Sequence, residues 1–243
     1  EKVLESLLNF LSDRSKKLNC CYFQVSIPFS NHQKIKDFTY PLILKKSIPK
    51  SYKRGKKFNY IYAGYGLNWV NLKEFNDFDS YLKSLKSQTR RNMRIAYRKN
   101  DCCSQIKNNN LEEIKTLYEL VQDNANSLNY NVRNFSEIDD TLITLLKTNQ
   151  GIYKKVVFNE EVLSAGFSVF TGSYITYLFG GTKRVKPDRK SGYLIHAENI
   201  RTSISLGLQG YNISMGGSNG VKKFKSNFGA EEIKFEEPHY YGI

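Results

Sequence analysis

The spacing of apolar and polar residues predicts a mixture of amphipathic helices and strands. Apolar residues that recur every three or four positions indicate a helix, and strict alternation indicates a strand. In the first hundred residues this pattern predicts a helix over 1–18, a strand over 20–27 and a long helix over 78–99. The long helix has one apolar side, formed by Leu82, Leu85, Thr89, Met93 and Ala96.

In residues 111–243, the pattern of apolar and polar positions predicts one compact unit in which helices flank a set of strands. Three strands follow one another through short turns, which indicates an antiparallel meander that stops at the pair Gly180–Gly181. The predicted elements are helices beginning after Asn110 and over 136–147, strands over 152–158, 162–170 and 174–179, a helix over 192–206, a strand over 211–215, a small helix around 224–225 and a strand near 233–235.

Length and composition place the chain among soluble globular proteins. Its 243 residues are 40% hydrophobic, which excludes a disordered chain and allows one large domain or two small ones. No run approaches the ~18 apolar residues of a membrane span, and no signal-peptide pattern is present. The four cysteines form two adjacent pairs, a spacing that rarely gives good disulfide geometry, and the three histidines show no metal-ligand spacing. We therefore expect a reduced, cytoplasmic protein without a metal site.

Basic residues are concentrated in the first part of the chain. Residues 1–110 contain 22 Lys and Arg against 8 Asp and Glu, whereas 111–243 contain 15 of each, so the net charge of +14 lies entirely in the first part. On the predicted helix over 78–99, basic residues recur on one side without acidic neighbours, and such like-charged pairs destabilise a helix. A bound anion would offset that cost, although a solvated helix face is the alternative. The residues expected to bind a phosphate-bearing substrate or tRNA are Lys86, Arg90, Arg91 and Arg94.

Two motifs give the chain a family resemblance. The segment Ser87–Ala96 reads Ser-Gln-Thr-Arg-Arg-Asn-Met-Arg-Ile-Ala and resembles a basic helix of the Fem-type peptidyltransferases and their GNAT-like relatives. More than a hundred residues later, Gly216-Gly217 and Gly220-Val221 precede Phe224-Lys225-Ser226-Asn227-Phe228-Gly229, which resembles the terminal signature of the same family. The motifs occur in the family's order, and the resemblance covers nearly the whole chain.

The resemblance implies an α/β (α+β) fold of the GNAT type, with a mixed, mostly antiparallel sheet flanked by helices. It also implies two parts, which are an incomplete, basic GNAT-like half over 1–105 and an acyltransferase domain over 106–243. The chain departs from the family in two respects: members are usually longer, and Ser214 stands where many have Asp. A mechanism with a carboxylate base at that position is therefore excluded.

The resemblance implies that the protein transfers an acyl or aminoacyl group to an amine. The favoured donor is aminoacyl-tRNA, because of the basic first part, and the favoured acceptor is a cell-wall precursor or another phosphate-bearing substrate. Two alternatives stay open: an acyl-CoA-dependent N-acyltransferase acting on an amino sugar or amino acid, and a non-catalytic RNA-binding module. No cofactor is expected besides the donor.

The resemblance also implies where the chemistry takes place. In GNAT folds the donor lies where two neighbouring strands splay apart, and backbone N–H groups there stabilise the oxyanion. Phe179, Gly180 and Gly181 occupy the matching strand end, although two glycines also suit a simple turn. Lys225 is expected to contact the nucleotide or the developing negative charge, and Phe224 either stacks on an adenine or packs as a core aromatic.

A third segment resembles the GNAT pyrophosphate loop, in which N–H groups at the start of a helix bind phosphate. It runs from Arg189 to Leu194, and Leu194 stands where the family has a small residue, which favours a donor other than CoA. The residues expected to bind the donor are Phe179, Gly181, Arg189, Gly192, Tyr193 and Lys222, and those expected to take part in catalysis are Lys225, Phe224 and Gly180.

Overall fold

The computed structural model describes residues 66–106, 110–127, 129, 131–214, 217–234 and 239–240, together with single positions between 6 and 24. The chain divides into two compact units, one over Asn68–Glu231 and one formed by 1–67 with 232–243. The cleft and the basic helix considered below both lie in Asn68–Glu231. The expected division into two GNAT-like halves, 1–105 and 106–243, is based on the family resemblance. These two compact units do not test it, and it stays a prediction.

Little of the chain before residue 66 belongs to the described part. Six described residues between Ser6 and Lys17 are helical, in agreement with the predicted first helix. Of the strand predicted over 20–27, only β1 (Phe23–Gln24) is described, and it pairs with β9 (His239–Tyr240). The other residues of that predicted strand, and Gly216 of the terminal signature, lie outside the described residues.

A seven-stranded sheet forms the centre of the fold, with the spatial order β3-β4-β5-β6-β7-β2-β8. Neighbouring strands from β3 to β6 are antiparallel, as are β2 and β7, while β6 and β7 are parallel. This mixed, mostly antiparallel sheet confirms the predicted fold class. Its strands are β2 (Gly66–Asn71), β3 (Cys102–Gln105), β4 (Gly151–Phe158), β5 (Glu161–Phe170), β6 (Tyr174–Thr182), β7 (Gly210–Asn212) and β8 (Glu231–Lys234).

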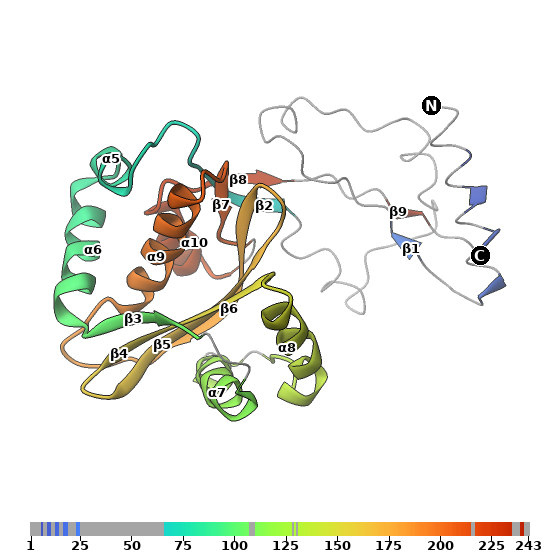
Figure 1. The fold of residues 1–243 in the computed structure, drawn as a ribbon, viewed down its shortest axis with the longest axis horizontal. Coiled ribbons are helices and arrows are strands. Elements are labelled where there is room, and N and C mark those ends of the chain that lie inside the picture. Colours follow the sequence, from blue (N-terminus) through green and yellow to red (C-terminus); the bar gives the residue numbers. More distant parts are fainter. Residues whose placement is uncertain are drawn as a thin grey trace. The chain divides into compact units, whose positions relative to one another are not determined.

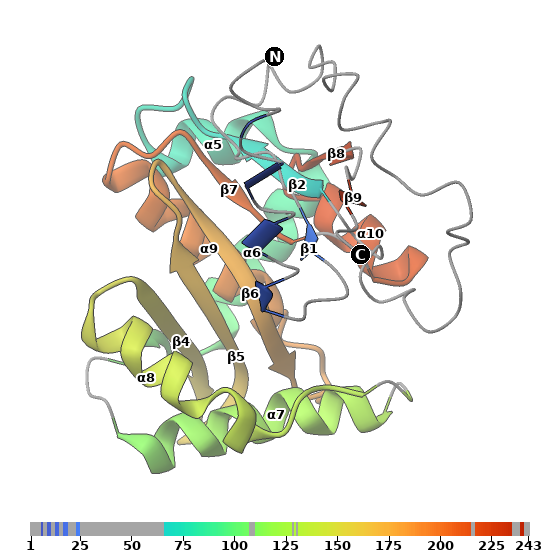
Figure 2. The same cartoon turned by 90° about the vertical axis from the view of Figure 1, so that its right-hand side faces the viewer.

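Helices cover both faces of this sheet (Figures 1 and 2). Helix α9 packs on one face, with α5 and α6 against its outer side, and α7 and α8 pack on the other face. The helices are α5 (Phe78–Ser84), α6 (Ser87–Lys99), α7 (Leu111–Ser127), α8 (Asp139–Lys147), α9 (Ser191–Ser205) and α10 (Asn219–Ser226), with a 3-10 turn η2 (Phe135–Glu137) before α8.

Strand alternation sends side chains into two separate cores. On β4, Ile152 and Val156 face the core under α9, whereas Tyr153 between them faces the core under α7 and α8. Both cores are closely packed, because these three side chains are at most 1% exposed. The sheet is therefore buried on both sides at its centre, and this holds its strands in fixed positions.

The basic helix predicted as one element over 78–99 is two helices. Helix α5 ends at Ser84, Leu85 is extended, and α6 begins at Ser87. The guanidinium of Arg90 donates hydrogen bonds to the carbonyls of Lys83 (3.0 Å) and Leu85, which the break leaves without helical partners. The single-helix prediction was wrong because this contact, which replaces the missing backbone bonds, is not visible in the residue spacing.

The predicted meander is confirmed, with one correction at its end. Strand β6 does not stop at Phe179 but runs through Gly180 and Gly181 to Thr182, so the two glycines form no turn. They allow close packing instead: a Cβ on Gly181 would lie 2.3 Å from the Leu120 carbonyl oxygen of α7, and one on Gly180 would lie 2.1 Å from the Tyr177 hydroxyl. The sequence also gave no prediction of β2 as a strand of its own, or of β3, which carries the free thiols Cys102 and Cys103.

Candidate active site

The two parallel strands at the centre of the sheet part after three residue pairs. Tyr174–Thr176 of β6 pair with Gly210–Asn212 of β7, and β7 ends there while β6 continues to Thr182. The pairing of β5 with β6 is irregular at the same place, because Phe167 lies opposite Phe179 while Ser168 lies opposite Tyr177. Leu178 is therefore an extra residue, and a bulge of this kind bends a strand. The regular pairing of β6 with β7 thus ends before Phe179–Gly181, the strand end to which the resemblance assigns the donor, and that assignment stays a prediction.

A cleft of about 700 Å³ opens at this splay. Residues from five elements line it, and five of the predicted site residues are among them. These five are Phe179, Gly180, Gly192, Phe224 and Lys225. The structure thus brings together strand β6, the start of α9 and helix α10, which are far apart in sequence, although it does not test the roles predicted for these residues.

Lys225 is held at one side of the cleft. Its side chain is buried on α10, with 8% of the residue exposed, and its Nζ donates a hydrogen bond to the Ser214 carbonyl (3.0 Å). Asn68 Nδ2 donates to the same carbonyl (2.6 Å). This bond fixes the position of the Lys225 ammonium at the side of the cleft.

Ser214 connects the two splayed strands. Its hydroxyl donates to the Tyr177 carbonyl of β6, and its backbone has a φ of +54°, in the left-handed region. A residue other than glycine in this conformation is strained, and surrounding contacts must hold it there. Ser214 is thus the residue that ties the end of β7 to β6 and presents its carbonyl to Lys225.

His196 lies in the wall of the cleft as a neutral imidazole. Burial, together with the nearby Lys225 ammonium, lowers the pKa of His196 to about 3. Its Nδ1 lies 2.7 Å from the Tyr211 hydroxyl, which itself accepts a hydrogen bond from Asn199 Nδ2 (3.2 Å). The Tyr211 hydroxyl can donate its own hydrogen to Nδ1, and in that tautomer the imidazole carries its hydrogen on Nε2. No hydrogen bond joins Nε2 to any described residue, so in this tautomer Nε2–H is the polar group that His196 offers to the cleft.

Aromatic rings surround this histidine. Tyr177 lies 4.6 Å from the His196 ring centre and Phe224 lies 5.4 Å from it. Behind Phe224, the rings of Tyr193 (4.9 Å) and Phe228 (5.1 Å) hold it in place. Phe224 is half-buried, so one part of its ring belongs to the core and another part faces the cleft.

Four other residues predicted to act here lie outside the cleft lining. Gly181 packs against α7, and the Tyr193 hydroxyl accepts a hydrogen bond from Asn227 Nδ2 (3.0 Å). The Arg189 guanidinium lies 3.1 Å from the Phe158 ring centre and donates to the Lys99 carbonyl. Lys222 is exposed on α10. Their roles in donor binding stay predictions.

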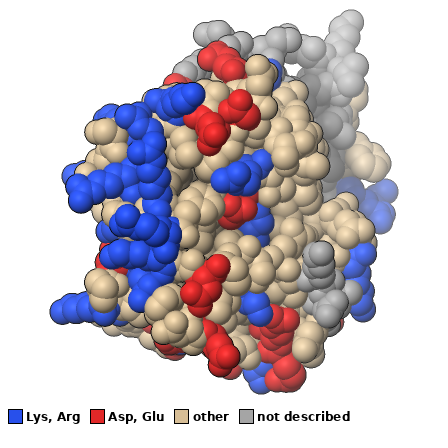
Figure 3. Space-filling model, turned by 60° about the vertical axis from the view of Figure 1, so that its left-hand side comes forward, with Lys and Arg blue, Asp and Glu red and all other residues tan. Residues whose placement is uncertain are grey.

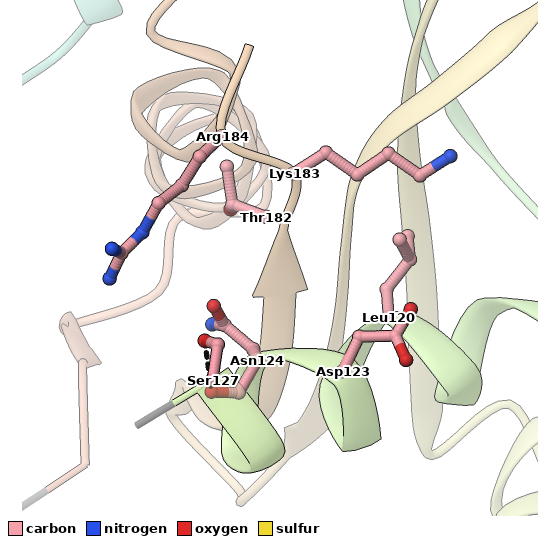
Figure 4. Close-up of a pocket in the computed structure, with 7 residues that line it drawn as sticks. All are labelled: Leu120, Asp123, Asn124, Ser127, Thr182, Lys183 and Arg184. Atoms are coloured by element: carbon pink, nitrogen blue, oxygen red, sulfur yellow. Dashed lines mark hydrogen bonds between the residues drawn. The ribbon is translucent and has the colours of Figure 1, made fainter. Parts of the chain in front are cut away.

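A smaller hollow of about 200 Å³ adjoins the cleft, with Asn124 and Thr182 lining both. It lies between the last turns of α7 and the end of β6 (Figure 4). The side chains of Lys183 and Arg184 extend to opposite sides there, and Lys183 forms an ion pair with Glu161 (2.9 Å). Arg184 is the basic side chain that this hollow offers close to the cleft.

The basic side of α6 forms a second surface, separate from the cleft. Arg91, Arg94 and Arg98 are exposed and line a shallow hollow of about 400 Å³ together with Ile95. None of these residues lines the cleft, and within the described part of the chain none of the three arginines forms an ion pair. Figure 3 shows the column of basic side chains on this side of the molecule. Arg90 is not free to join them because it caps α5, and Lys86 is exposed where α6 begins.

Two kinds of feature are absent from the described residues. None of the described helices combines the length and the apolar composition that a membrane crossing requires. The described His, Cys, Asp and Glu side chains form no group of three or more that could hold a metal ion.

Comparisons with known proteins match this architecture through structure rather than sequence. No protein-family model matches the chain, and no curated protein matches it either. The crystal structure of FemX superposes with a TM-score of 0.71, at 13% sequence identity, over 99% of this chain and 77% of FemX. The chain has a Fem-type fold. A conserved protein of unknown function from Bacteroides thetaiotaomicron also matches, with a TM-score of 0.61 and 13% identity, over 97% of this chain and 74% of that one.

The sequence motifs located only part of the cleft wall. Ser214 stands out in the sequence only as a departure from the family, and Tyr177, His196, Tyr211 and Asn199 belong to none of the motifs. Tyr177 and Ser214 are 37 positions apart, and they come into contact because β7 pairs with β6 immediately before them. The positive φ of Ser214 likewise has no sequence signal, because glycine is the residue that ordinarily marks such a position.

Proposed function

We propose that this protein is an N-acyltransferase that moves an acyl or aminoacyl group from an activated donor, aminoacyl-tRNA, to an amine. The observation that carries the proposal is the buried Lys225 ammonium, fixed beside a cleft that opens where β6 and β7 part. A fixed positive charge in a partly water-excluded site is suited to stabilise negative charge that develops on a carbonyl oxygen. The Fem-type fold is consistent with this use of the splay.

The reaction needs few protein groups. The lone pair of a neutral amine attacks the carbonyl carbon of the donor ester, a C–N bond forms, and the π electrons move to the oxygen. The Lys225 ammonium stabilises this oxyanion, with His196 Nε2–H and the β6 backbone near Gly180 as further donors. The C–O bond to the donor then breaks, and the proton lost by the amine passes to the leaving oxygen. The products are an amide and the deacylated donor.

The cleft offers no strong base for the amine proton. Its described lining residues include no carboxylate, and the low pKa of His196 makes the imidazole a poor proton acceptor at neutral pH. The attacking amine therefore has to arrive uncharged, and its proton moves to the leaving group within the intermediate. Ser214, at the position where many Fem-type proteins have Asp, serves instead through its carbonyl, which holds Lys225.

Two features favour aminoacyl-tRNA over acyl-CoA as the donor. The Arg189 side chain stacks on Phe158, and Lys190 forms an ion pair with Asp188 (2.6 Å), so both basic side chains of the expected pyrophosphate loop already have partners within the protein. The exposed arginines of α6 suit a larger polyanion that reaches beyond the cleft, either the tRNA or a phosphate-bearing acceptor such as a cell-wall precursor.

The test offers two labelled donors to the purified protein. Total tRNA charged with ¹⁴C-labelled amino acids, or ¹⁴C-labelled acyl-CoA, is incubated with a nucleotide-linked cell-wall peptide that has a free amine, and labelled amide is measured. We expect amide from the tRNA donor, formed about 10² to 10³-fold more slowly by the Lys225→Met variant. Amide from acyl-CoA without tRNA would support the CoA-dependent alternative. Salt-sensitive tRNA binding without product from either donor would favour the non-catalytic RNA-binding module.

A further inference from the structure

The walls of the cleft are mainly apolar. Aliphatic side chains from α7, β6, α9, α10 and two connecting segments contribute to its lining. The aliphatic residues of the lining include Val121, Val132, Ile195, Ile213 and Val221. Apolar walls with a few placed polar groups are typical of sites that enclose an uncharged ligand group.

Charge inside the cleft is limited to one side chain. Lys225 is the single charged residue among the described residues that line it, and no carboxylate is present to balance a second cation. His196 is neutral there, and its polar Nδ1 side is already occupied by the Tyr211 hydroxyl. A cationic side chain buried in this cleft would lose water without gaining a carboxylate partner and would be repelled by Lys225, which makes its burial costly.

Three rings form a wall on one side of the cleft. Tyr177, His196 and Phe224 lie with neighbouring ring centres 4.6 Å and 5.4 Å apart, and Phe228 supports the group at 5.1 Å from both His196 and Phe224. Because the supporting rings fix this wall, it is preorganised before a ligand arrives. A flat or branched apolar group would bury its surface against the wall without further ordering of these side chains.

We propose that this cleft selects a donor whose acyl group has a bulky apolar side chain, aromatic or branched aliphatic, and rejects a cationic one. The inference rests on the proposed acyl transfer, and it specifies the substrate class of that site. The ammonium of Lys225 stays with the carbonyl oxygen that becomes the oxyanion, while the side chain of the acyl group lies against the Tyr177, His196 and Phe224 rings. An anionic side chain would compete with the oxyanion for Lys225 and is also disfavoured.

A binding experiment tests this selectivity without any assumption about the donor carrier or the acceptor. The protein is labelled with ¹³C at Ile and Val methyl groups and titrated with N-acetyl amides of Phe, Leu, Ala, Lys and Glu, and with adenosine. Ile195, Ile213 and Val221 report on the cleft, and Ile114, which is fully buried in the core under α7, is the control. We expect the Phe and Leu amides to shift the cleft methyls with a Kd at least about 10-fold below that of the Ala amide, since small differences in apolar size give discrimination of that order. The Lys and Glu amides should bind no more tightly than Ala.

Other results of this titration would overturn the proposal. Equal Kd values across the series, tighter binding of the Lys or Glu amide, or the absence of any cleft shift with all the amides would each do so. If adenosine shifts the same methyls at lower concentration than the Phe amide, the ring wall binds a base instead of an acyl side chain, and the proposal is wrong.

A single substitution should reverse the selectivity. Val221 is 38% exposed on the first turn of α10, so a carboxylate there disturbs no core and is favoured by the helix N-terminus. We expect Val221→Asp to tighten the binding of the Lys amide and weaken that of the Phe amide, whereas the matched variant Val221→Asn tightens neither. Equal behaviour of the two variants would show that charge does not determine the selectivity.

The outcomes separate this inference from the proposed function. If the amides bind with the expected ranking of Kd values but no donor gives product, the acyltransferase proposal is contradicted and the apolar selectivity is still supported. Equal rates of product formation from phenylalanyl-, alanyl- and lysyl-tRNA would contradict the selectivity and leave the acyltransferase proposal standing.

Discussion

The cleft and the basic side of α6 present positive charge in opposite ways. In the cleft, one lysine is buried, hydrogen-bonded to the Ser214 carbonyl and surrounded by aromatic and aliphatic side chains. On α6, Arg91, Arg94 and Arg98 extend into solvent beside a shallow hollow. The first arrangement fixes a charge at one point, and the second spreads several charges over a surface.

This difference has a physical consequence for what each region can do. A buried ammonium lacks much of its hydration, so its burial is costly and tolerated only where partners hold it, but its field on a nearby oxyanion is strong. Exposed arginines keep their water, cost little and are screened by salt within about 10 Å. The cleft is therefore suited to chemistry on one atom, and α6 is suited to attraction of a large anion.

The largest expected effect is on the buried charge itself. Replacement Lys225→Met keeps a long apolar side chain and removes the ammonium, so we expect acyl transfer to fall by about 10² to 10³-fold, the usual effect of losing one oxyanion donor. The fold should remain, because an apolar side chain in place of a buried charge is often neutral or stabilising. Rates of labelled amide formation and thermal melting curves measure the two quantities.

The two measurements must move independently for this interpretation to hold. A melting temperature that falls together with the activity would indicate that Lys225 is a structural residue. The variant Lys225→Arg is the control for charge alone, and because its longer, planar head cannot occupy the same position, we expect it to recover only part of the rate.

The second effect concerns the neutral histidine of the cleft. The folded pKa of His196, about 3, lies below the ordinary value of 6.5, so between these values the unfolded chain binds a proton that the folded chain does not. Stability conferred by the neutral imidazole is thus present above pH 6.5 and is lost as the pH falls. From this histidine alone we expect a free energy of unfolding about 2 kcal/mol lower at pH 5 than at pH 8. Urea unfolding at both pH values measures it.

A variant without an ionisable group isolates this contribution. His196→Gln should show a pH dependence that is weaker by the same amount, since glutamine does not titrate and still offers an acceptor to Tyr211. An identical pH dependence of wild type and variant would mean that His196 titrates in the folded protein, and the description of it as a permanently neutral donor would then be wrong.

The sequence predicted most elements of the fold for a clear reason. The strands β4 to β6 and the helices α7 to α9 each have an apolar side and a polar side, or short turns at their ends. Both patterns are local, so they can be recognised in a single sequence. Strand β2 was missed as a separate element because Leu67, Asn68, Trp69 and Val70 are all buried, so the strand shows no alternation. The break between α5 and α6 was missed because Arg90 stabilises it through a contact specific to this fold.

The site was predictable to the extent that short motifs determine it. Phe224 and Lys225 belong to one motif, and Gly180 belongs to the meander, so these residues could be assigned to the site in advance. The charge and shape of the cleft depend on residues from separate segments: Tyr177 and Ser214 meet because β7 pairs with β6, and the neutrality of His196 follows from burial. These properties arise from tertiary structure and have no local pattern.

The third effect tests the connection between the two splayed strands. Ser214→Ala removes the hydroxyl bond to the Tyr177 carbonyl and keeps the strained backbone, so we expect a loss of about 1 kcal/mol in the free energy of unfolding. Ser214→Gly removes the same hydroxyl but relieves the strain, so its stability should stay near that of the wild type. Both variants keep the carbonyl that holds Lys225 but lose the hydroxyl bond that fixes this segment to β6, so both should lose activity by about 10-fold. An activity that follows stability, with Gly active and Ala impaired, would make Ser214 a conformational residue only.

The smallest effect on chemistry is expected on α6, where charge acts at a distance from the cleft. The triple replacement of Arg91, Arg94 and Arg98 by Gln should weaken tRNA binding and lower the slope of log K against log salt by about 2, since each phosphate contact contributes roughly 0.7 to 0.9. The rate at saturating donor should stay unchanged, because none of the three lines the cleft. Stability should not fall, since the like-charged pairs at i, i+3 and i, i+4 are relieved.

A second triple variant shows whether position or net charge matters. Lys115, Arg133 and Lys147 are exposed on or near α7 and α8, on the opposite face of the sheet, and their replacement by Gln removes the same total charge. If α6 contacts the phosphates directly, this control leaves the slope almost unchanged and weakens binding only slightly, through the smaller overall field. If the two triple variants weaken binding equally, the arginines of α6 are a solvated surface, and the distinction between a chemical cleft and a separate recognition helix does not hold.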